Sequence, residues 1–194
     1  MEIVGKNAKP TGTTPSVLLV NPRFAHNVGM VVRLASCYGL QQVWYTGDRV
    51  RMEVERRGKL PREERMKGYK EVEIIQFDRP FEQFQNVVPV AVEVRPNSER
   101  LHEFEHPRNA LYVFGPEDAS IPETMLRLCH RFVIIPTRNR YCLNLATAVS
   151  TVLWDRAMKL NEIPKEVSDE PVGHEETDPR TLGLFNEVSD TWPA

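Results

Sequence analysis

Six short apolar runs recur along this chain, and they constrain its fold more than any other feature of the sequence. The runs cover residues 16–20, 42–45, 72–77, 88–94, 110–114 and 132–135. Their valine, isoleucine and aromatic content is typical of buried β-strands, and helical patterns lie between several of them. Strands that alternate with helices predict an α/β fold, in which helices on both faces cover a mostly parallel sheet. Ligands of such sheets bind beyond the carboxyl ends of the strands.

Composition divides the 194 residues into three parts. Residues 1–15 are polar and rich in Gly, Thr and Pro, which predicts a flexible lead-in. Residues 16–162 contain the six apolar runs and are long enough for one domain with a hydrophobic core. Residues 163–194 are rich in Pro, Glu and Asp, which predicts a mobile acidic tail. No apolar stretch approaches the ~18 residues that cross a bilayer and no secretion signal is present, so we expect a cytoplasmic protein without a membrane partner.

The formal net charge of −2 is distributed unevenly along the chain. From Glu162 onward nine acidic residues oppose two basic ones, a formal charge of −7, which leaves +5 for the rest of the chain. Residues 49–70 hold nine Lys and Arg side chains against four acids. Such a segment can neutralise RNA phosphates, although a mixed charge run is just as typical of a solvated helix or loop. The candidate phosphate contacts in this segment are Arg56, Arg57, Arg62 and Arg65.

The cysteines and histidines do not form a metal-binding pattern. Cys37, Cys129 and Cys142 make no C-x-x-C pair, and no histidine follows them at zinc-site spacing. The five histidines are scattered along the chain. We therefore expect reduced thiols and no metal.

A first polar motif follows the run 16–20 and reads Asn27-Val28-Gly29-Met30-Val31-Val32-Arg33. We expect Asn27 to cap a helix that runs to about Gly39. Its buried stripe is predicted to consist of Val28, Val31, Val32, Ala35 and Tyr38. Arg33 is predicted to lie on the opposite face, beside the small residues Gly29, Ser36 and Cys37. Small neighbours leave room for a ligand to reach the guanidinium, although an ordinary solvated helix arginine would show the same pattern.

Two further motifs follow later strands. Phe114-Gly115-Pro116-Glu117-Asp118 ends a strand with a glycine that permits close approach and a carboxylate that suits a polar ligand or an arginine. Ile135-Pro136 ends the last strand and is followed, after a polar loop, by Cys142-Leu143-Asn144-Leu145. Asn144 is predicted to cap a helix whose buried stripe is Leu145, Ala148, Val149 and Val152.

The order and context of these three motifs resemble the SpoU/TrmH-type branch of the SPOUT RNA methyltransferases, over about residues 16–160. The resemblance implies a C-terminal deep trefoil knot and a homodimer, with helices 28–38 and 145–159 as candidate contacts. It also implies methyl transfer from S-adenosylmethionine to an RNA ribose 2′-hydroxyl. The catalytic residues that it implies are Asn27, Arg33, Glu117 and Asn144. The cofactor residues that it implies are Gly115, Glu117, Ile135, Pro136, Cys142, Leu143 and Asn144.

In this interpretation Arg33 binds the phosphate next to the target ribose and stabilises developing negative charge, while Glu117 and Asn27 orient it. Water or a phosphate oxygen accepts the proton, because the pKa of arginine exceeds ~12. The lead-in is too short for the separate RNA-binding domain of many ribosomal-RNA members, so the chain resembles the compact members of the family. Several compact members modify transfer RNA, and we therefore expect transfer RNA as the substrate in preference to ribosomal RNA. A base nitrogen is the weaker alternative target.

Two positions depart from the family pattern. Cys142 stands where the family usually has serine, and a thiol is the weaker hydrogen-bonding group. Ser120 stands where relatives usually have glycine, which would strain the backbone if that position required a positive φ. These departures keep a second hypothesis open, namely a catalytically inactive knotted protein that binds RNA or assists assembly.

Overall fold

The computed structural model describes residues 16–57, 72–82, 84, 86–139 and 141–163. The predicted lead-in, most of the basic segment 49–70 and nearly all of the acidic tail lie outside the described residues. Every helix and strand discussed below belongs to the first of two units, Met1–Glu162. The second unit, Ile163–Ala194, is described only at its first residue.

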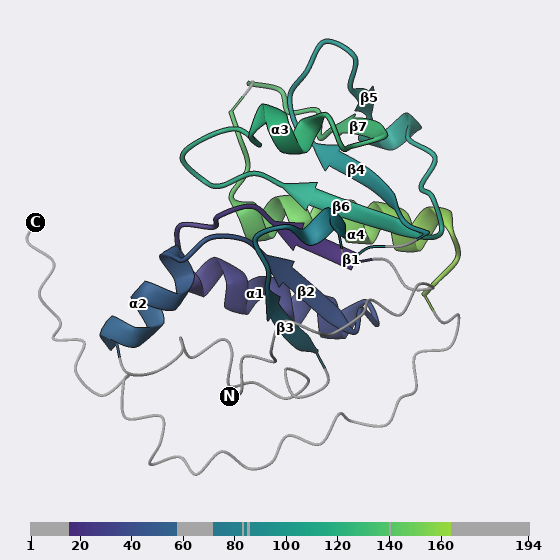
Figure 1. The fold of residues 1–194 in the computed structure, drawn as a ribbon. Coiled ribbons are helices and arrows are strands. Elements are labelled where there is room, and N and C mark those ends of the chain that lie inside the picture. The colour runs from purple at the N-terminus through teal and green to yellow at the C-terminus, as the bar shows by residue number, and fades with distance from the viewer. Residues whose placement is uncertain (1–15, 58–71, 83, 85, 140, 164–194) are drawn as a thin grey trace, which may run out of the picture. The chain divides into compact units, whose positions relative to one another are not determined.

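A seven-stranded sheet forms the centre of the fold, and all of its strand pairs are parallel. The strands are β1 (Ser16–Leu19), β2 (Gln42–Tyr45), β3 (Glu73–Gln76), β4 (Val88–Val92), β5 (Glu99–Arg100), β6 (Ala110–Phe114) and β7 (Arg131–Ile134). Their order is β3-β2-β1-β6-β4-β7-β5 (Figure 1). The predicted α/β class and the six predicted strands are confirmed. Strand β5 was not predicted, because its two exposed, charged residues form no apolar run.

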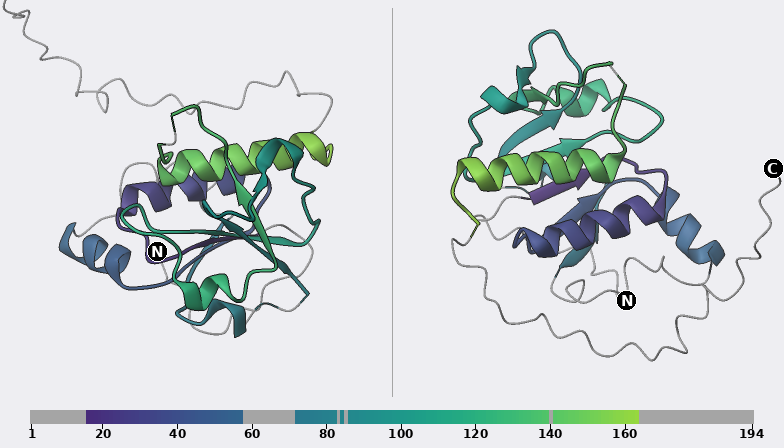
Figure 2. Two further views of the ribbon diagram at one scale, coloured as in Figure 1. Left: turned by 90° about the horizontal axis from the view of Figure 1, so that it is seen from above. Right: turned by 180° about the vertical axis from the view of Figure 1, so that it is seen from behind.

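Helices cover both faces of the sheet, as predicted (Figure 2). The long helices α1 (Ala25–Cys37) and α4 (Leu145–Lys159) pack on one face, together with the 3₁₀ helix η4 (Leu101–Glu103). The short helix α3 (Glu123–Leu126) and the 3₁₀ helix η3 (Pro80–Glu82) pack on the other. Helix α2 (Arg49–Arg57) follows β2. No helix in the described part of the chain combines the length and apolar character needed to cross a membrane.

Helix α1 begins three residues earlier than predicted, at Ala25 instead of Val28. Its N-cap is Phe24, and the Glu53 carboxylate accepts a 2.6 Å hydrogen bond from the Ala25 N–H. The prediction that Asn27 caps this helix is wrong, because a carboxylate from α2 already serves a first-turn N–H and leaves the Asn27 side chain available elsewhere. The predicted stripe of three valines and Ala35 is buried, and Tyr38 is partly buried at the C-cap. Gly29 is also buried, so it does not share the exposed face of Arg33.

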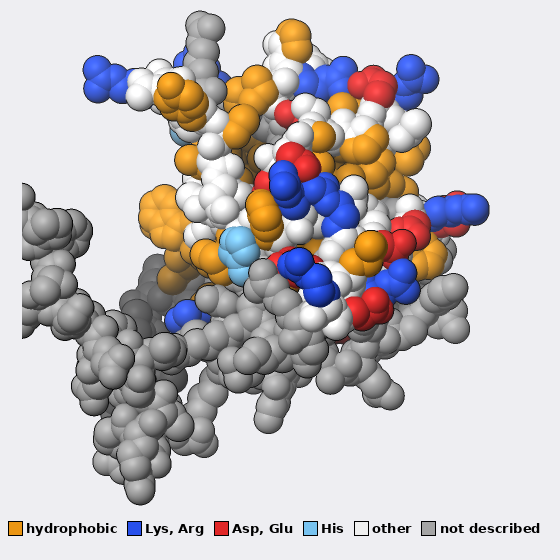
Figure 3. Space-filling model, turned by 90° about the vertical axis from the view of Figure 1, so that its left-hand side faces the viewer, with side chains coloured by type: hydrophobic (Ala, Val, Ile, Leu, Met, Phe, Trp, Pro, Cys, Tyr) orange, Lys and Arg blue, Asp and Glu red, His pale blue; other side chains and the backbone are white. Residues whose placement is uncertain are grey.

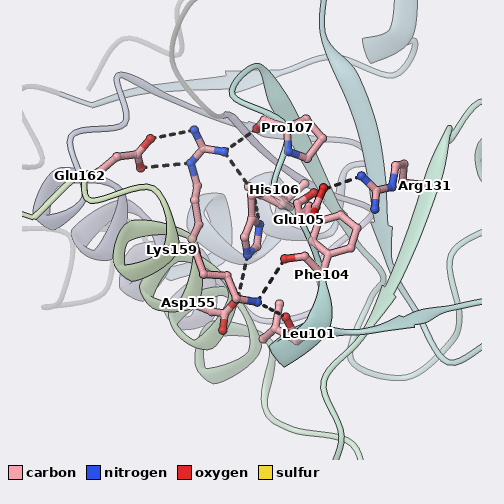
Figure 4. Close-up of polar contacts among 11 residues, drawn as sticks. Leu101, Phe104, Glu105, His106, Pro107, Arg131, Asp155, Lys159 and Glu162 are labelled. Carbon is pink, nitrogen blue, oxygen red and sulfur yellow. Dashed lines mark hydrogen bonds and ion pairs between the residues drawn. The ribbon is translucent and has the colours of Figure 1, made fainter.

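A buried polar network fixes the C-terminal half of α4 to the chain that enters β6 (Figure 4). The His106 ring lies 2.6 Å from the Tyr112 hydroxyl and 2.8 Å from the Asp155 carboxylate. Arg156 donates to the Pro107 carbonyl at 2.6 Å and pairs with Glu162. Burial lowers the pKa of His106 and raises the pKa of Tyr112 to about 12, so both groups are uncharged at neutral pH. The network holds α4 in place, and the opposite end of α4 enters the candidate site.

Candidate active site

Four neighbouring strands end at one edge of the sheet, and the three sequence motifs follow three of these ends. Leu19 of β1 pairs with Phe114 of β6, and Val92 of β4 pairs with the same residue. Because parallel strands point the same way, the loops after β1, β4, β6 and β7 meet at this carboxyl edge. Figure 3 looks onto this edge, where basic and acidic side chains lie side by side near the centre with hydrophobic side chains around them. The sheet therefore brings the three distant motifs together.

A cavity of about 960 Å³ opens at this edge. Six of the predicted cofactor residues line it, namely Gly115, Glu117, Ile135, Pro136, Cys142 and Leu143. Asn144 lies between two lining residues, Leu143 and Leu145, at the start of α4. The cavity is also lined by residues that were not predicted, among them Val92, Glu93, Val94 and Arg100. Val92, Glu93 and Val94 lie at the end of β4, so they could have been predicted only from the rule that ligands bind beyond the carboxyl ends of parallel strands.

Gly115 lies close to Ile121 of the same loop, and a side chain at Gly115 would have little room. A Cβ atom at this position would lie 3.1 Å from the Ile121 N atom and 3.3 Å from the Ile121 Cγ1 atom. The Glu93 carboxylate holds the far side of this loop by accepting a 3.0 Å hydrogen bond from the Ile121 N–H. Ser120 does not adopt a positive φ, so the expected backbone strain at this position is absent. The loop is therefore closely packed without the glycine that relatives usually carry there.

A chain of hydrogen bonds connects one residue from each motif. The Asn27 side chain is 1% exposed and donates to Glu117 Oε1 at 2.6 Å. Asn144 donates through its Nδ2 atom to the Asn27 Oδ1 atom at 3.1 Å. The Asn144 Oδ1 atom accepts from the N–H groups of Ala146 and Thr147, which confirms the predicted cap of α4. This relay fixes the amide orientations of both asparagines and sets the position of Glu117.

The second oxygen of Glu117 is engaged as well. Glu117 Oε2 accepts a 2.7 Å hydrogen bond from the Arg23 N–H. Both carboxylate oxygens therefore already accept strong donors, which favours a positioning role over a role as proton acceptor. Arg23 was not predicted as a site residue, because any residue type except proline can supply a backbone N–H donor.

Asp118 connects the same loop to α2. Its carboxylate accepts two hydrogen bonds from the Arg49 guanidinium, at 3.1 and 2.7 Å, and lies 3.5 Å from Arg23. The hydrogen bond from Arg49 lowers the pKa of Asp118, and the same contact raises the pKa of Arg49. The first arginine of the basic segment is thus bound to a carboxylate of the protein.

Arg33 and Arg56 do not line the cavity. Arg33 is exposed on α1, about 9 Å along the helix axis from Asn27, and it is not one of the residues that line the cavity. Arg56 is exposed on α2. The side chain of Arg57 and both Arg62 and Arg65 lie outside the described residues. The structure therefore brings together Asn27, Glu117 and Asn144 but does not place Arg33 beside them within one chain.

The three cysteines are free thiols, with Cys37 and Cys142 exposed and Cys129 buried. Burial raises the pKa of Cys129 to about 11, so this thiol is inert at neutral pH. Cys142 lines the cavity, next to Tyr141, which is 79% exposed at its mouth. The described residues include no group of His, Cys, Asp and Glu side chains that could hold a metal ion.

Solved structures of RNA-modifying enzymes share this fold. The AdoMet-bound rRNA methyltransferase from Sinorhizobium meliloti matches with a TM-score of 0.63 and 20% identity, over 79% of this chain and 59% of its own. The SpoU methyltransferase AviRb from Streptomyces viridochromogenes, in complex with AdoMet, matches with a TM-score of 0.61 and 17% identity, over 77% and 59%. The TrmH/SpoU tRNA modifying enzyme from A. aeolicus matches with a TM-score of 0.65 and 18% identity, over 81% and 83%. This chain spans about three fifths of the length of the first two proteins.

These matches show that the chain has the parallel α/β fold of TrmH/SpoU-type methyltransferases. The sequence itself narrows the class further. Residues 15–154 match the SpoU rRNA Methylase family, and the chain belongs to that family. The resemblance to the SpoU/TrmH branch of the SPOUT superfamily is confirmed. No curated protein sequence matches the chain significantly.

Proposed function

We propose that this protein transfers a methyl group from S-adenosylmethionine to a ribose 2′-hydroxyl of RNA. The observation that carries the proposal is the relay Glu117–Asn27–Asn144, which connects all three family motifs at the rim of one cavity. Asn27 is 90 residues from Glu117 and 117 residues from Asn144 in the sequence. The three side chains therefore meet because of the tertiary fold and not because they are neighbours in one helix or strand. Membership of the SpoU family supports an RNA substrate.

The cavity fits S-adenosylmethionine in size and chemistry. Its volume of about 960 Å³ lies at the upper end of the usual range for cofactor sites, ~300–1,000 Å³. Ile135, Pro136 and Leu143 offer an apolar surface for a flat adenine ring. Glu93, Arg100 and Glu117 also line the cavity and can meet polar groups of the cofactor. When bound, S-adenosylmethionine supplies an electrophilic methyl group on a positively charged sulfur.

The residues of the chain then have separate tasks. The hydrogen bond between Asn27 and Asn144 fixes the start of α1 relative to the start of α4, which keeps the cavity wall rigid. Glu117 anchors the loop after β6 to the loop after β1. Arg33 binds the phosphate beside the target ribose and stabilises developing negative charge. Water or a phosphate oxygen accepts the hydroxyl proton, since arginine holds its own proton and Glu117 is already bonded at both oxygens.

The position of Arg33 leads us to propose a homodimer in which each Arg33 serves the cavity of the other copy. Helices α1 and α4 lie on one face of the sheet and expose large apolar side chains, namely Met30 on α1 and Trp154 and Met158 on α4. Burying such side chains against a second copy would remove apolar surface from water. The knotted C-terminal topology expected from the family belongs to this proposal too.

Transfer RNA is the proposed substrate. The tRNA modifying enzyme from A. aeolicus is matched over 83% of its length, whereas the rRNA methyltransferase from Sinorhizobium meliloti and the SpoU methyltransferase AviRb are each matched over 59% of theirs. The likeness of the fold to that of a tRNA modifying enzyme supports this proposal. The basic segment 49–70 is proposed to contact the RNA backbone.

The decisive experiment has two stages. Calorimetry with S-adenosylmethionine first tests the cofactor site, and saturable micromolar binding is expected. Transfer of labelled methyl groups to total tRNA and to rRNA then tests the substrate, with nuclease digestion and mass spectrometry to locate the methyl group on the ribose or the base. Absence of binding by folded protein would contradict the enzymatic proposal and favour an RNA-binding protein.

A mixing experiment tests the role of Arg33. Arg33→Ala should abolish transfer while leaving cofactor affinity unchanged, and Gly115→Val should abolish cofactor binding while leaving Arg33 intact. If each cavity uses the arginine of the other copy, mixing and refolding the two inactive variants should restore about a quarter of wild-type activity, because half of the dimers are mixed and each of these has one complete site. Full activity in Arg33→Ala would contradict its assigned role.

A further inference from the structure

The loop that joins β1 to α1 presents an exposed aromatic pair. Phe24 is 38% exposed, and the His26 side chain is exposed two residues later. Their ring centroids lie 5.5 Å apart, with the ring planes tilted by only 31°. The guanidinium carbon of Arg23 lies 5.1 Å from the centroid of the Phe24 ring. We refer to Arg23, Phe24 and His26 as the aromatic platform.

The backbone beneath the aromatic platform is held in place by hydrogen bonds from three other segments. Asn21 donates its N–H to the Thr46 hydroxyl at 3.0 Å and accepts a 3.3 Å bond from Arg49 at its carbonyl. The N–H groups of Arg23 and Ala25 donate to the carboxylates of Glu117 and Glu53, respectively. These contacts use backbone and polar atoms and not the Phe24 or His26 rings. The backbone that carries the two rings is therefore held in place, while the Phe24 and His26 side chains are exposed at the protein surface.

The aromatic platform lies directly beside the candidate active site. Leu19 at the end of β1 pairs with Phe114 at the end of β6, so the loops that follow are neighbours. Glu117 lines the cavity and at the same time accepts the hydrogen bond from the Arg23 N–H. The relay residue Asn27 follows His26 directly. A nucleotide that contacts the platform would therefore be adjacent to one whose ribose enters the cavity.

We propose that the aromatic platform stacks on an unpaired base of the RNA substrate next to the nucleotide that is methylated. This inference rests on the proposed function and extends it, because it specifies a single-stranded or loop segment of RNA as the substrate. Bases are free to stack on protein aromatic groups only where the RNA is unpaired. Stacking needs no base-specific hydrogen bond, since every base has a π-face.

Arg23 adds to this binding surface. Half of its side chain is exposed, and its contact with Asp118 is long, at 3.5 Å, whereas Arg49 holds the same carboxylate at 2.7 Å. The Arg49 pair can therefore persist while the Arg23 guanidinium turns to the phosphate of a stacked nucleotide. A planar guanidinium also stacks on bases and aromatic rings.

A direct binding assay tests the platform without relying on activity. The probe is an RNA hairpin with 2-aminopurine in its loop, whose fluorescence reports stacking, and the same fluorophore in a base-paired stem is the control RNA. Wild-type protein should bind the loop probe with a fluorescence change, and Phe24→Ala should weaken binding by about 5- to 150-fold. Phe24→Trp should retain the affinity, because an indole ring preserves the stacking surface. Leu128→Ala removes another exposed apolar side chain, located after α3, and should leave binding unchanged.

The controls separate this proposal from the proposed function. Affinity for S-adenosylmethionine and the melting temperature should be the same in Phe24→Ala as in the wild type. If wild-type protein transfers methyl groups and Phe24→Ala binds the loop probe equally well, the platform proposal is wrong and the proposed function stands. If Phe24→Ala changes the oligomeric state in sedimentation velocity, or if Phe24→Trp binds as weakly as Phe24→Ala, Phe24 belongs to a subunit contact or a steric site and stacking is refuted.

Discussion

The buried amide of Asn27 provides the most direct test of the relay. Asn27→Ala removes a 2.6 Å hydrogen bond to the Glu117 carboxylate and the acceptor of a 3.1 Å hydrogen bond from Asn144. A hydrogen bond to a charged group contributes about 1.5–3 kcal/mol and a neutral one about 0.5–1.5 kcal/mol. Glu117 is half-buried and Asn144 is exposed, so water replaces part of both interactions. We therefore expect a loss of about 2 kcal/mol in the free energy of unfolding.

For a domain of this size, that loss corresponds to a decrease in melting temperature of about 4–8 °C. The assay is chemical denaturation followed by circular dichroism, with calorimetric melting as a second measurement. Cys37→Ala, an exposed residue in the last turn of the same helix, is the matched control and should change stability by less than about 0.5 kcal/mol.

A charged replacement strengthens the test. Asn27→Asp places a second carboxylate against Glu117 in a site that is 1% exposed, so it should destabilise the protein more than Asn27→Ala at pH 7. Burial and the neighbouring charge raise the folded-state pKa of the new carboxyl, so the additional loss should shrink as the pH falls and the group becomes protonated. Equal stability of the wild type and Asn27→Ala, or of the two variants at pH 7, would refute the relay.

Three further predictions concern other parts of the molecule. Gly115→Ala, whose Cβ would lie 3.1 Å from the Ile121 N atom, should displace the loop after β6 and weaken S-adenosylmethionine binding by about tenfold or more in calorimetry; unchanged affinity would show that the loop has room to adjust. Trp154→Glu should convert the proposed dimer to monomers in sedimentation velocity, with Leu128→Glu as the control, and a dimeric Trp154 variant would exclude this face of α4. Because burial lowers the pKa of His106 below its usual 6.5, protons bind the unfolded chain first, and the free energy of unfolding should fall as the pH decreases from 6.5 to 5.5, by up to about 1.4 kcal/mol per pH unit. His106→Gln should remove this dependence, and an unchanged slope in the variant would assign it to other groups.

Sequence patterns predicted the helices and strands well where burial imposes a periodic arrangement of apolar residues. The six apolar runs became the six longer strands, and the valine stripe of α1 is buried as expected. The prediction failed at β5 and at the start of α1. Glu99–Arg100 is too short to show any periodicity, and the cap of α1 comes from Glu53, which lies on a different helix. Local pattern carries no information about a hydrogen-bond partner that folding brings from elsewhere.

The candidate site, too, was predicted in part from local sequence and in part became visible only in the structure. The three motifs were found in the sequence, and six of the predicted cofactor residues line the cavity. The sequence could not show that Asn27 donates to Glu117 and accepts from Asn144, nor that the end of β4 completes the wall. The sequence also could not show that Arg33 lies outside the cavity of its own chain. Asn27 and Arg33 belong to one sequence motif, but six residues of helix separate them by about 9 Å along the axis.

The sequence by itself determined the fold class, the family and the residue types available for chemistry. Hydrophobic periodicity and residue identity act over a few neighbours, so they are readable along the chain. Only the tertiary structure decided which polar groups meet, because the order of the parallel strands brings the ends of β1, β6, β4 and β7 to one edge from positions more than a hundred residues apart. The same arrangement turned Asn27 from an expected helix cap into the central residue of the relay, and it placed the aromatic platform beside the cavity.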